Sequence, residues 1–207
     1  MLYKDFMKHA KVLTDNAEKV APHRVAIQGV LHKKDGTLAV TDSHRIYHAL
    51  TVDGVDEDVV KTVTGRVIDE KYPDVSRLIP DTNDADSTAR FNVKELHDAV
   101  DHIYSVAKLA DETVTLGVER DHVYASAQVK EPGKLTTEMS ASYDVQLPLD
   151  EGNTFRVNAK YLLDALKMFK AEKEEEVTLY FYGKHRPFTI WNDKADLIAL
   201  ILPIRIY

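Results

Sequence analysis

The chain has 207 residues, of which 44% are hydrophobic, and it carries a net charge of −7 with no cysteine. This length suffices for one large domain or two small ones. The lack of cysteine excludes disulfides and thiolate metal sites and favours the cytoplasm, and no run of about 18 apolar residues predicts a membrane span. The acidic balance argues against a protein that is basic all over, but a local basic stripe remains compatible with it.

The front of the chain predicts a helix followed by antiparallel strands. Residues 3–20 place apolar side chains on one face at helical spacing, which indicates an amphipathic helix. Strands are expected next over Val25–His32, Thr37–Thr41 and Arg45–Val52, with a turn at Lys34–Gly36 between the first two.

Residues 53–90 differ in composition from the rest of the chain. They contain acidic clusters and only a short strand candidate at 63–68. We therefore expect a smaller front domain over residues 1–80, a polar linker over 81–90 and a fuller domain over 91–207.

The fuller domain repeats itself. Residues 92–100 align without gaps on residues 158–166, an offset of 66 residues (158 minus 92). Asn92 and Asn158 each open a copy as the predicted N-cap of a helix with apolar residues at helical spacing. Alternating runs typical of strands follow at 113–118, 122–129 and 134–146 in the first copy and at 177–182, 187–191 and 197–206 in the second. Counting the looser front copy, the sequence predicts an α+β fold of about three helix-plus-strands units.

Residues suited to catalysis are sparse. Residues 41–45 are polar and lie between two predicted strands, and a hydrolase would use His44 as base, Asp42 to orient it and Ser43 as nucleophile. Because adjacent residues of an extended chain point in opposite directions, a polar turn is the simpler interpretation. No cofactor or metal is predicted, since the sequence has neither a phosphate-binding glycine loop nor a helical histidine pair with an acidic partner.

Lysines on the predicted helices are stronger candidates for a function than the polar residues 41–45. The candidate DNA contacts are Lys4, Lys8, Lys11, Lys94, Lys160, Lys167 and Lys170. An ordinary solvated helix face explains the same pattern. Nucleic-acid binding would require the stripes to converge on one surface, where each lysine could pair with a phosphate.

Four segments in order along the chain share one resemblance. Residues 41–46 read Thr-Asp-Ser-His-Arg-Ile, residues 72–80 read Tyr-Pro-Asp-Val-Ser-Arg-Leu-Ile-Pro, and residues 202–206 read Leu-Pro-Ile-Arg-Ile. Together with residues 158–169, these segments resemble motifs of the bacterial DNA polymerase III β subunit, the β sliding clamp family. The resemblance is densest from Tyr72 onward.

This resemblance implies the DNA-clamp, or processivity, fold in a shortened form of about one and a half clamp domains. Residues 1–80 resemble a truncated second clamp domain, residues 91–207 resemble a complete third, and a counterpart of the first domain is lacking. In clamps the helices face DNA and the sheets lie outside. The resemblance therefore implies that the helix lysines contact phosphates without reading bases.

The same resemblance implies a peptide-binding groove between the two lobes. Aliphatic side chains would accept the Leu and Phe of a partner's linear motif, and Arg45, Arg77 and Arg205 would frame the rim. The implied groove residues are Ile27, Thr41, Ser43, His44, Arg45, Ile46, Pro73, Arg77, Leu78, Leu200, Ile201, Leu202, Pro203, Ile204 and Arg205.

The implied function is that of a non-catalytic subunit. It would bind motifs of DNA polymerase and other replication proteins, and it would contact or encircle duplex DNA as a homo-oligomer to confer processivity. Two alternatives stay open: a clamp-like docking module without a ring, which competes as a decoy for clamp-binding partners, and the hydrolase with Asp42, Ser43 and His44.

Overall fold

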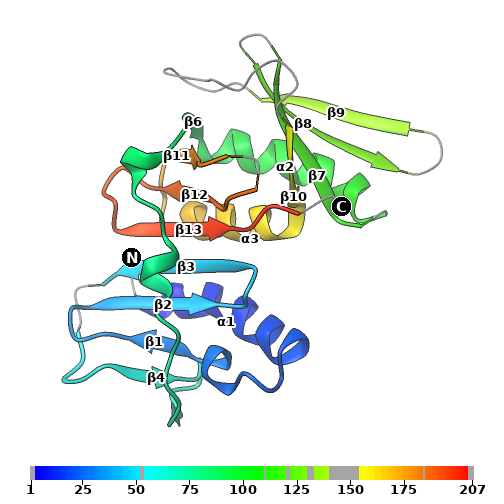
Figure 1. Ribbon diagram of the computed structural model, residues 1–207. Helices are drawn as coiled ribbons and strands as arrows, with labels where there is room; N and C mark the ends of the chain where they lie inside the picture. Colours follow the sequence, from blue (N-terminus) through cyan, green and yellow to red (C-terminus); the bar gives the residue numbers. More distant parts are fainter. Residues whose placement is uncertain are drawn as a thin grey trace. The chain divides into compact units, whose positions relative to one another are not determined.

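The structure is a computed structural model that describes residues 3–51, 54–109, 111–119, 122–129, 133–139, 154–183 and 185–204 (Figure 1). The chain divides into two compact units. The first unit comprises Met1–Pro80 and Lys194–Leu200, and the second comprises Asp81–Asp193 and Ile201–Tyr207. No helix in the described part of the chain is long and apolar enough to cross a membrane.

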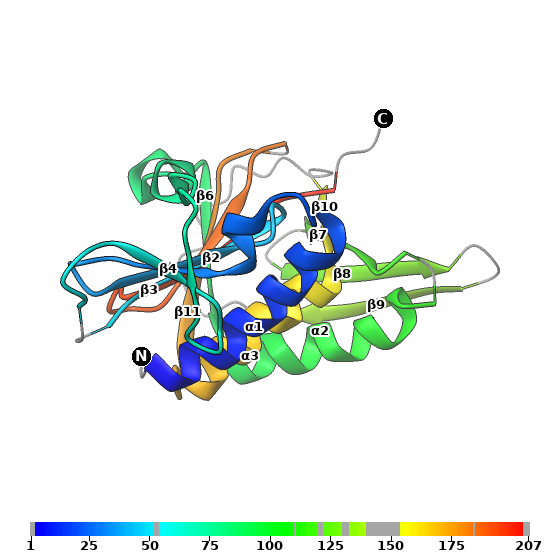
Figure 2. The same ribbon diagram turned by 90° about the horizontal axis from the view of Figure 1, so that it is seen from below.

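Helix α1 (Tyr3–Val20) of the first unit has a fully buried apolar stripe, as the sequence predicts. The stripe consists of Phe6, Ala10, Leu13 and Ala17. The helix packs against strands β2 (Thr37–Thr41) and β3 (Arg45–Leu50), as Figure 2 shows. Its first turn contains an acidic residue and its last turn a basic one, and both charges suit the helix dipole.

The strands of the first unit form an antiparallel array in the order β5-β4-β1-β2-β3-β13. Their bounds are β1 Val30–His32, β2 Thr37–Thr41, β3 Arg45–Leu50, β4 Val59–Lys61, β5 Val67–Ile68 and β13 Leu197–Ile201. The prediction of a single strand over Val25–His32 is wrong, because Val25–Gln28 forms the 3-10 helix η1 and only the last three residues form β1. The candidate strand over 63–68 shrinks to β5, and β4 was not predicted.

One apolar cluster of the first unit joins segments that are far apart in the sequence. It includes Ile27 of η1, Ile46 of β3, Leu200 of β13, and Tyr72 and Val75 around the 3-10 helix η2 (Val75–Leu78). Val60 and Ile68 of strands β4 and β5 complete it near Gly29, where an added Cβ would lie 2.7 Å from Val60 Cγ1 and 2.8 Å from Ile68 Cδ1. Glycine at that position therefore permits the close approach of β4 and β5.

The second unit contains both copies of the sequence repeat. The first copy comprises β6 Ser87–Asn92, α2 Val93–Ala107, β7 Thr113–Glu119, β8 His122–Val129 and β9 Gly133–Met139. The second copy comprises β10 Thr154–Asn158, α3 Ala159–Ala171, β11 Glu176–Phe181 and β12 Phe188–Trp191, and it continues into β13. The N-caps are as predicted, since the Asn92 side chain accepts hydrogen bonds from the N–H groups of Lys94 and Glu95, and that of Asn158 accepts from Tyr161.

The two copies exchange their first strands. Strand β6 pairs with β11, and strand β10 pairs with β7, all antiparallel. Matching backbone bonds lock each helix start to the other copy: Val93 N–H donates to Glu175 O at 2.9 Å, and Ala159 N–H donates to Glu112 O at 2.8 Å. Helices α2 and α3 pack against each other. The repeat thus builds one domain, because neither copy can complete its sheet alone.

Two other predicted boundaries differ from the structure. Residues 81–90, predicted as a linker, contain the 3-10 helix η3 (Thr82–Asp84) and most of β6, which is paired along its whole length. The last strand, predicted over 197–206, ends at Ile201. Of the strand predicted over 134–146, the part after Met139 lies outside the described residues.

Candidate functional site

The turn between β2 and β3 carries four of the predicted groove residues and is held by its own side chains. Thr41 Oγ1 donates to Arg45 O at 2.8 Å and accepts from Ser43 N–H at 3.1 Å. Asp42 Oδ1 accepts from the N–H groups of His44 and Arg45, both at 3.0 Å. Ser43 has a φ of +76°, a left-handed conformation that the tight turn imposes. Ser43 and His44 are exposed at the turn.

Arg45 does not frame an exposed rim, which corrects the sequence-based expectation. Its side chain is 2% exposed, and Nε donates to Asp42 Oδ2 at 2.9 Å, where Asp42 is fully buried. Asn16 Nδ2 from helix α1 donates to the same carboxylate oxygen at 2.9 Å. Both oxygens of Asp42 therefore serve the turn, which argues against its predicted alternative role of orienting His44 in a hydrolase.

The segment around η2 is anchored to this hairpin. Thr41 N–H donates to the Tyr72 hydroxyl oxygen at 3.1 Å, and burial raises the pKa of Tyr72. Beyond this anchor the side chains are exposed: Leu78 is 58% exposed, and the exposed Arg77 forms an ion pair with Asp74 at 2.8 Å. Pro73 is half-buried.

Within the first unit, the structure brings several predicted groove residues together. Ile27, Ile46 and Leu200 belong to one apolar cluster and are almost fully buried. These three buried side chains form core of the first unit, whereas the exposed Leu78 offers apolar area to a ligand.

Sequence reasoning missed Arg24. Its guanidinium Nη1 donates to Ser43 Oγ at 2.6 Å, so an exposed cation lies directly at the turn. No sequence motif predicts that a single arginine contacts Ser43, which lies 19 residues later in the chain. The contact forms only in the folded structure.

The predicted tail residues belong to the second unit apart from Leu200. Ile201 is fully buried, Pro203 is half-buried, and Leu202 is 40% exposed. Ile204 is exposed, and its N–H donates to Arg156 O at 2.8 Å, which ties the tail to the middle of strand β10. Arg205 lies outside the described residues.

The predicted DNA-contacting lysines of α1 are mostly paired with neighbouring carboxylates. Lys8 Nζ lies 2.7 Å from Asp5 Oδ1, and Lys11 Nζ lies 2.6 Å from Asp15 Oδ2. Lys4 is exposed, with no ion pair to another described residue.

Two candidate lysines of the second unit, Lys94 and Lys170, lie near one carboxylate. Asp98 accepts from Lys94 of α2 at 2.8 Å and lies 3.8 Å from Lys170 of α3. The hydrogen bond from Lys94 is the main reason that the pKa of Asp98 falls to about 2. Lys160 pairs with Asp164 on α3 in the same way, whereas Lys167 is exposed with no ion pair among the described residues.

Comparisons with known proteins give the family. Residues 76–205 match the family described as DNA polymerase III beta subunit, C-terminal domain. The chain belongs to this family, that of the beta sliding clamps. It is 33% identical over 145 residues to the beta sliding clamp of Lactococcus lactis, an alignment that covers 68% of this chain and 36% of that protein. The chain thus spans about a third of the length of the curated relatives it matches.

Solved clamp structures match nearly the whole chain. The DNA polymerase III beta chain of Streptococcus pneumoniae superposes with a TM-score of 0.78 at 25% identity, covering 99% of this chain and 64% of that one. The sliding clamp of Bacillus subtilis gives a TM-score of 0.77 at 23% identity and covers 96% of this chain and 63% of that one. The α+β clamp fold expected from the sequence is therefore confirmed. In the described residues no group of three or more His, Cys, Asp or Glu is arranged to hold a metal.

Proposed function

We propose that this clamp-family chain is a non-catalytic docking subunit that acts in the cytoplasm and binds linear motifs of DNA polymerase and other replication proteins. One observation carries the proposal. Leu200, near the end of the chain, packs in one cluster with Ile27, Ile46 and Val75, beside the turn that presents Ser43 and His44. Segments whose sequences resemble the clamp groove thus share one core in the first unit.

The ligand would meet exposed apolar side chains that lie near these segments along the chain. Leu78 lies on the first unit, and Leu202 and Ile204 follow Leu200 within four residues along the chain. Each gains about 25 cal/mol per Å² of apolar area that a peptide covers. Arg24 and Arg77 are the exposed cations able to donate to peptide carbonyls or carboxylates, in place of the buried Arg45.

A peptide titration tests this role. A fluorescein-labelled clamp-motif peptide with Leu and Phe anchors should bind the wild-type chain with saturable anisotropy. Leu78→Ala and Leu202→Ala should each weaken binding about tenfold, because each removes about 1.4 kcal/mol of apolar contact. Leu109→Ala, a change at an exposed leucine after helix α2, is the matched control and should have no effect. Unchanged affinity in both groove variants would reject the groove.

We further propose that the chain contacts duplex DNA through its helix lysines as a homo-oligomer and thereby confers processivity. Of the seven candidate lysines, Lys4 and Lys167 are exposed without an ion pair to a described carboxylate, so they are the first candidates for phosphate contacts. The clamp family membership supports this role, and the chain's span of about two thirds of a solved clamp chain leaves ring closure to experiment.

A docking module without a ring, which competes for clamp-binding partners, is the second candidate. The ion pairs on the helices favour this module, because a lysine already paired with Asp98 or Asp164 gains little binding free energy when it meets a phosphate. Helix α2 also carries three carboxylates and one lysine. Light scattering and binding to a labelled duplex at low salt separate the two: an oligomer that binds DNA supports the clamp, and a monomer that binds only the motif peptide supports the module.

A further inference from the structure

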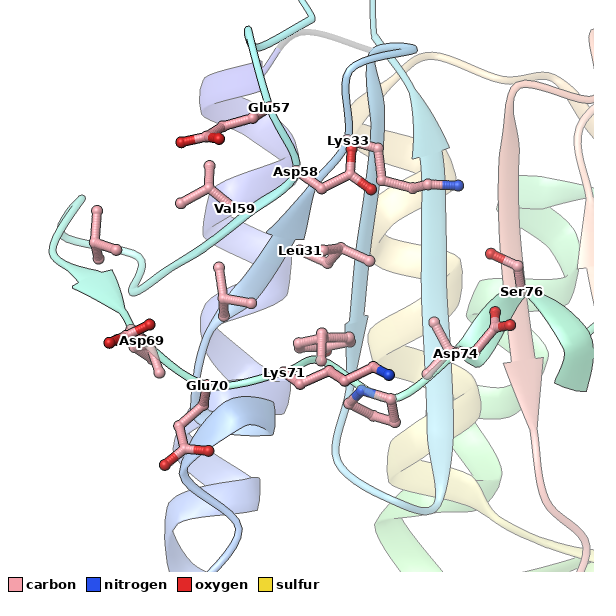
Figure 3. A pocket seen from close by; sticks show the side chains of 16 residues that line it. Leu31, Lys33, Glu57, Asp58, Val59, Asp69, Glu70, Lys71, Asp74 and Ser76 are labelled. Carbon is pink, nitrogen blue, oxygen red and sulfur yellow. The ribbon is translucent and has the colours of Figure 1, made fainter.

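A pocket of about 800 Å³ lies on the first unit, apart from the turn that presents Ser43 and His44. Strand β1, strand β4 with the residues before it, and the segment from β5 to Ser76 line it. Figure 3 shows Leu31 and Val59 of the strands on one side and residues 69–74 on the other. Nothing in the proposed docking function uses this pocket, although Pro73 belongs to both the predicted groove and the pocket wall.

The pocket has an apolar floor. Leu31 and Val59 are half-buried and Val67 is 58% exposed, so all three leave apolar surface open to a ligand. Tyr72 and Val75 behind them are buried in the cluster that holds η2. The floor is therefore backed by packed core, and a ligand's aliphatic or aromatic side chain would gain contact without a large rearrangement.

The rim of the pocket is acidic. Five carboxylates line it against two lysines, Lys33 and Lys71. Asp74 pairs with Arg77, and Asp58 accepts from the backbone N–H of Lys34 at 3.0 Å. Glu57, Asp69 and Glu70 are exposed and form no ion pair with another described residue. Three carboxylates are thus available to a cationic ligand.

We propose that this pocket is a second docking site, which binds a short basic peptide segment that alternates Lys or Arg with aliphatic or aromatic residues. Charge complementarity selects this occupant: the rim attracts cations, while the floor takes the apolar side chains. A second copy of this chain fits less well, because it would bring a net charge of −7 against an acidic rim. An extended segment also suits the short edge strand β5, whose outer side has no strand neighbour in the described sheet.

A charge-reversal experiment tests the site. The probe is a fluorescein-labelled peptide that alternates lysine with leucine and phenylalanine, and the comparison peptide replaces every lysine with glutamate. The lysine peptide should bind the wild-type chain more tightly, and rising salt should weaken it. The double variant Asp69→Lys with Glu70→Lys should lower its affinity about tenfold or more, since two attractive contacts become repulsive.

Two controls make the result specific. Glu175→Lys changes an exposed carboxylate of the second unit and should leave binding unchanged. The backbone carbonyl of Glu175, which accepts from Val93 N–H, is kept in this variant. The double variant should keep the wild-type melting temperature and bind the clamp-motif peptide normally, so failure of this site and failure of the groove are distinguishable. Leu31→Ala should lower the affinity for the lysine peptide about fivefold, because it removes apolar area from the pocket floor.

Three outcomes would overturn the proposal. One is equal binding of the lysine and glutamate peptides. Another is unchanged affinity for the lysine peptide in the double variant. The third is self-association of the wild-type chain that the double variant abolishes, which would assign the pocket to a second copy.

Discussion

At the scale of single residues, the β2–β3 turn depends on a buried charge pair. Asp42 and Arg45 are almost entirely out of water and satisfy each other and the turn's backbone. Such a pair contributes little beyond a well-packed apolar pair, but losing one partner leaves an uncompensated buried charge. The turn that presents Ser43 and His44 is therefore sensitive to Asp42 in particular.

Replacing Asp42 by alanine should lower the free energy of unfolding by about 3–5 kcal/mol, because Arg45 would stay buried without its counter-charge. Urea denaturation followed by circular dichroism measures this loss. Asp74→Ala removes an exposed partner of Arg77 and should cost at most about 1 kcal/mol. A similar small cost for both variants would show that Arg45 reaches water easily.

A buried histidine should make stability depend on pH. His32 Nδ1 donates to Val30 O at 3.0 Å, so Nε2 accepts from the Tyr3 hydroxyl at 3.1 Å. Burial lowers the pKa of His32, and that of His48 likewise. Below about pH 6.5 the unfolded chain binds more protons than the folded one. The free energy of unfolding is thus greatest above about pH 6.5 and declines as the pH falls further.

His32→Gln should make this decline shallower, leaving the part due to His48. Urea denaturation at about pH 7.5, 6.0 and 5.0 gives the slope for each protein. Parallel slopes for the variant and the wild type would mean that His32 takes up its proton as easily in the folded state as in the unfolded one.

At the scale of elements, the helices could be predicted and the short strands could not. Apolar spacing and the asparagine caps gave α1, α2 and α3 nearly to the residue, since those signals are local. The run Val25–Gln28 is apolar enough for a strand, but its backbone folds into η1. Strand β4 has three residues in an acidic stretch, too few for a periodic pattern.

For the candidate sites too, the sequence predicts some features and not others. Motif resemblance predicts a groove at the β2–β3 turn, η2 and the tail, and this stays a prediction. It could not show that Arg45 is buried, that Arg24 reaches Ser43, or that Leu31 and Lys71 line one pocket. The last two facts depend on contacts between residues about 20 to 40 positions apart, and the burial of Arg45 depends on how the whole unit packs, so no local pattern encodes them.

The two helix caps should respond differently to the same substitution. Among the described residues, the Asn92 side chain accepts hydrogen bonds and donates none, so Asn92→Asp keeps its function and suits the helix dipole. Asn158 also donates through Nδ2 to Glu112 Oε2 at 3.3 Å, and Asn158→Asp would put two carboxylates together. We expect a change near zero for Asn92→Asp and a loss of about 1 kcal/mol or more for Asn158→Asp. Thermal unfolding compares the pair, and equal effects would contradict the contact with Glu112.

At the scale of the whole molecule, the chain has a net charge of −7, and Lys8, Lys11, Lys94 and Lys160 pair with carboxylates of their own helices. Attraction to DNA should therefore be weak and confined to low salt. The proposed contact with DNA is supported by membership of the clamp family and by the superposition of 99% of this chain on 64% of a solved clamp chain.

Asp98→Asn tests whether ion pairs on the helices weaken the attraction of the lysines to DNA. It would release Lys94 and Lys170 together, and we expect the affinity for a labelled DNA duplex at low salt to rise several-fold, with a steeper salt dependence. Glu175→Asn, which removes an exposed carboxylate that forms no ion pair with a described residue, is the control. An unchanged salt slope would show that these lysines do not face DNA.

The central claim is that the chain binds a short peptide through the β2–β3 turn, η2 and the residues that follow Leu200. The most direct measurement is amide NMR of the labelled chain during titration with the clamp-motif peptide. We predict that the shifts concentrate at Ser43, His44, Leu78 and the residues after Leu200. Saturable binding whose shifts fall elsewhere, or no shift at peptide concentrations of about 1 mM, a weak-binding limit near 4 kcal/mol, would contradict the account.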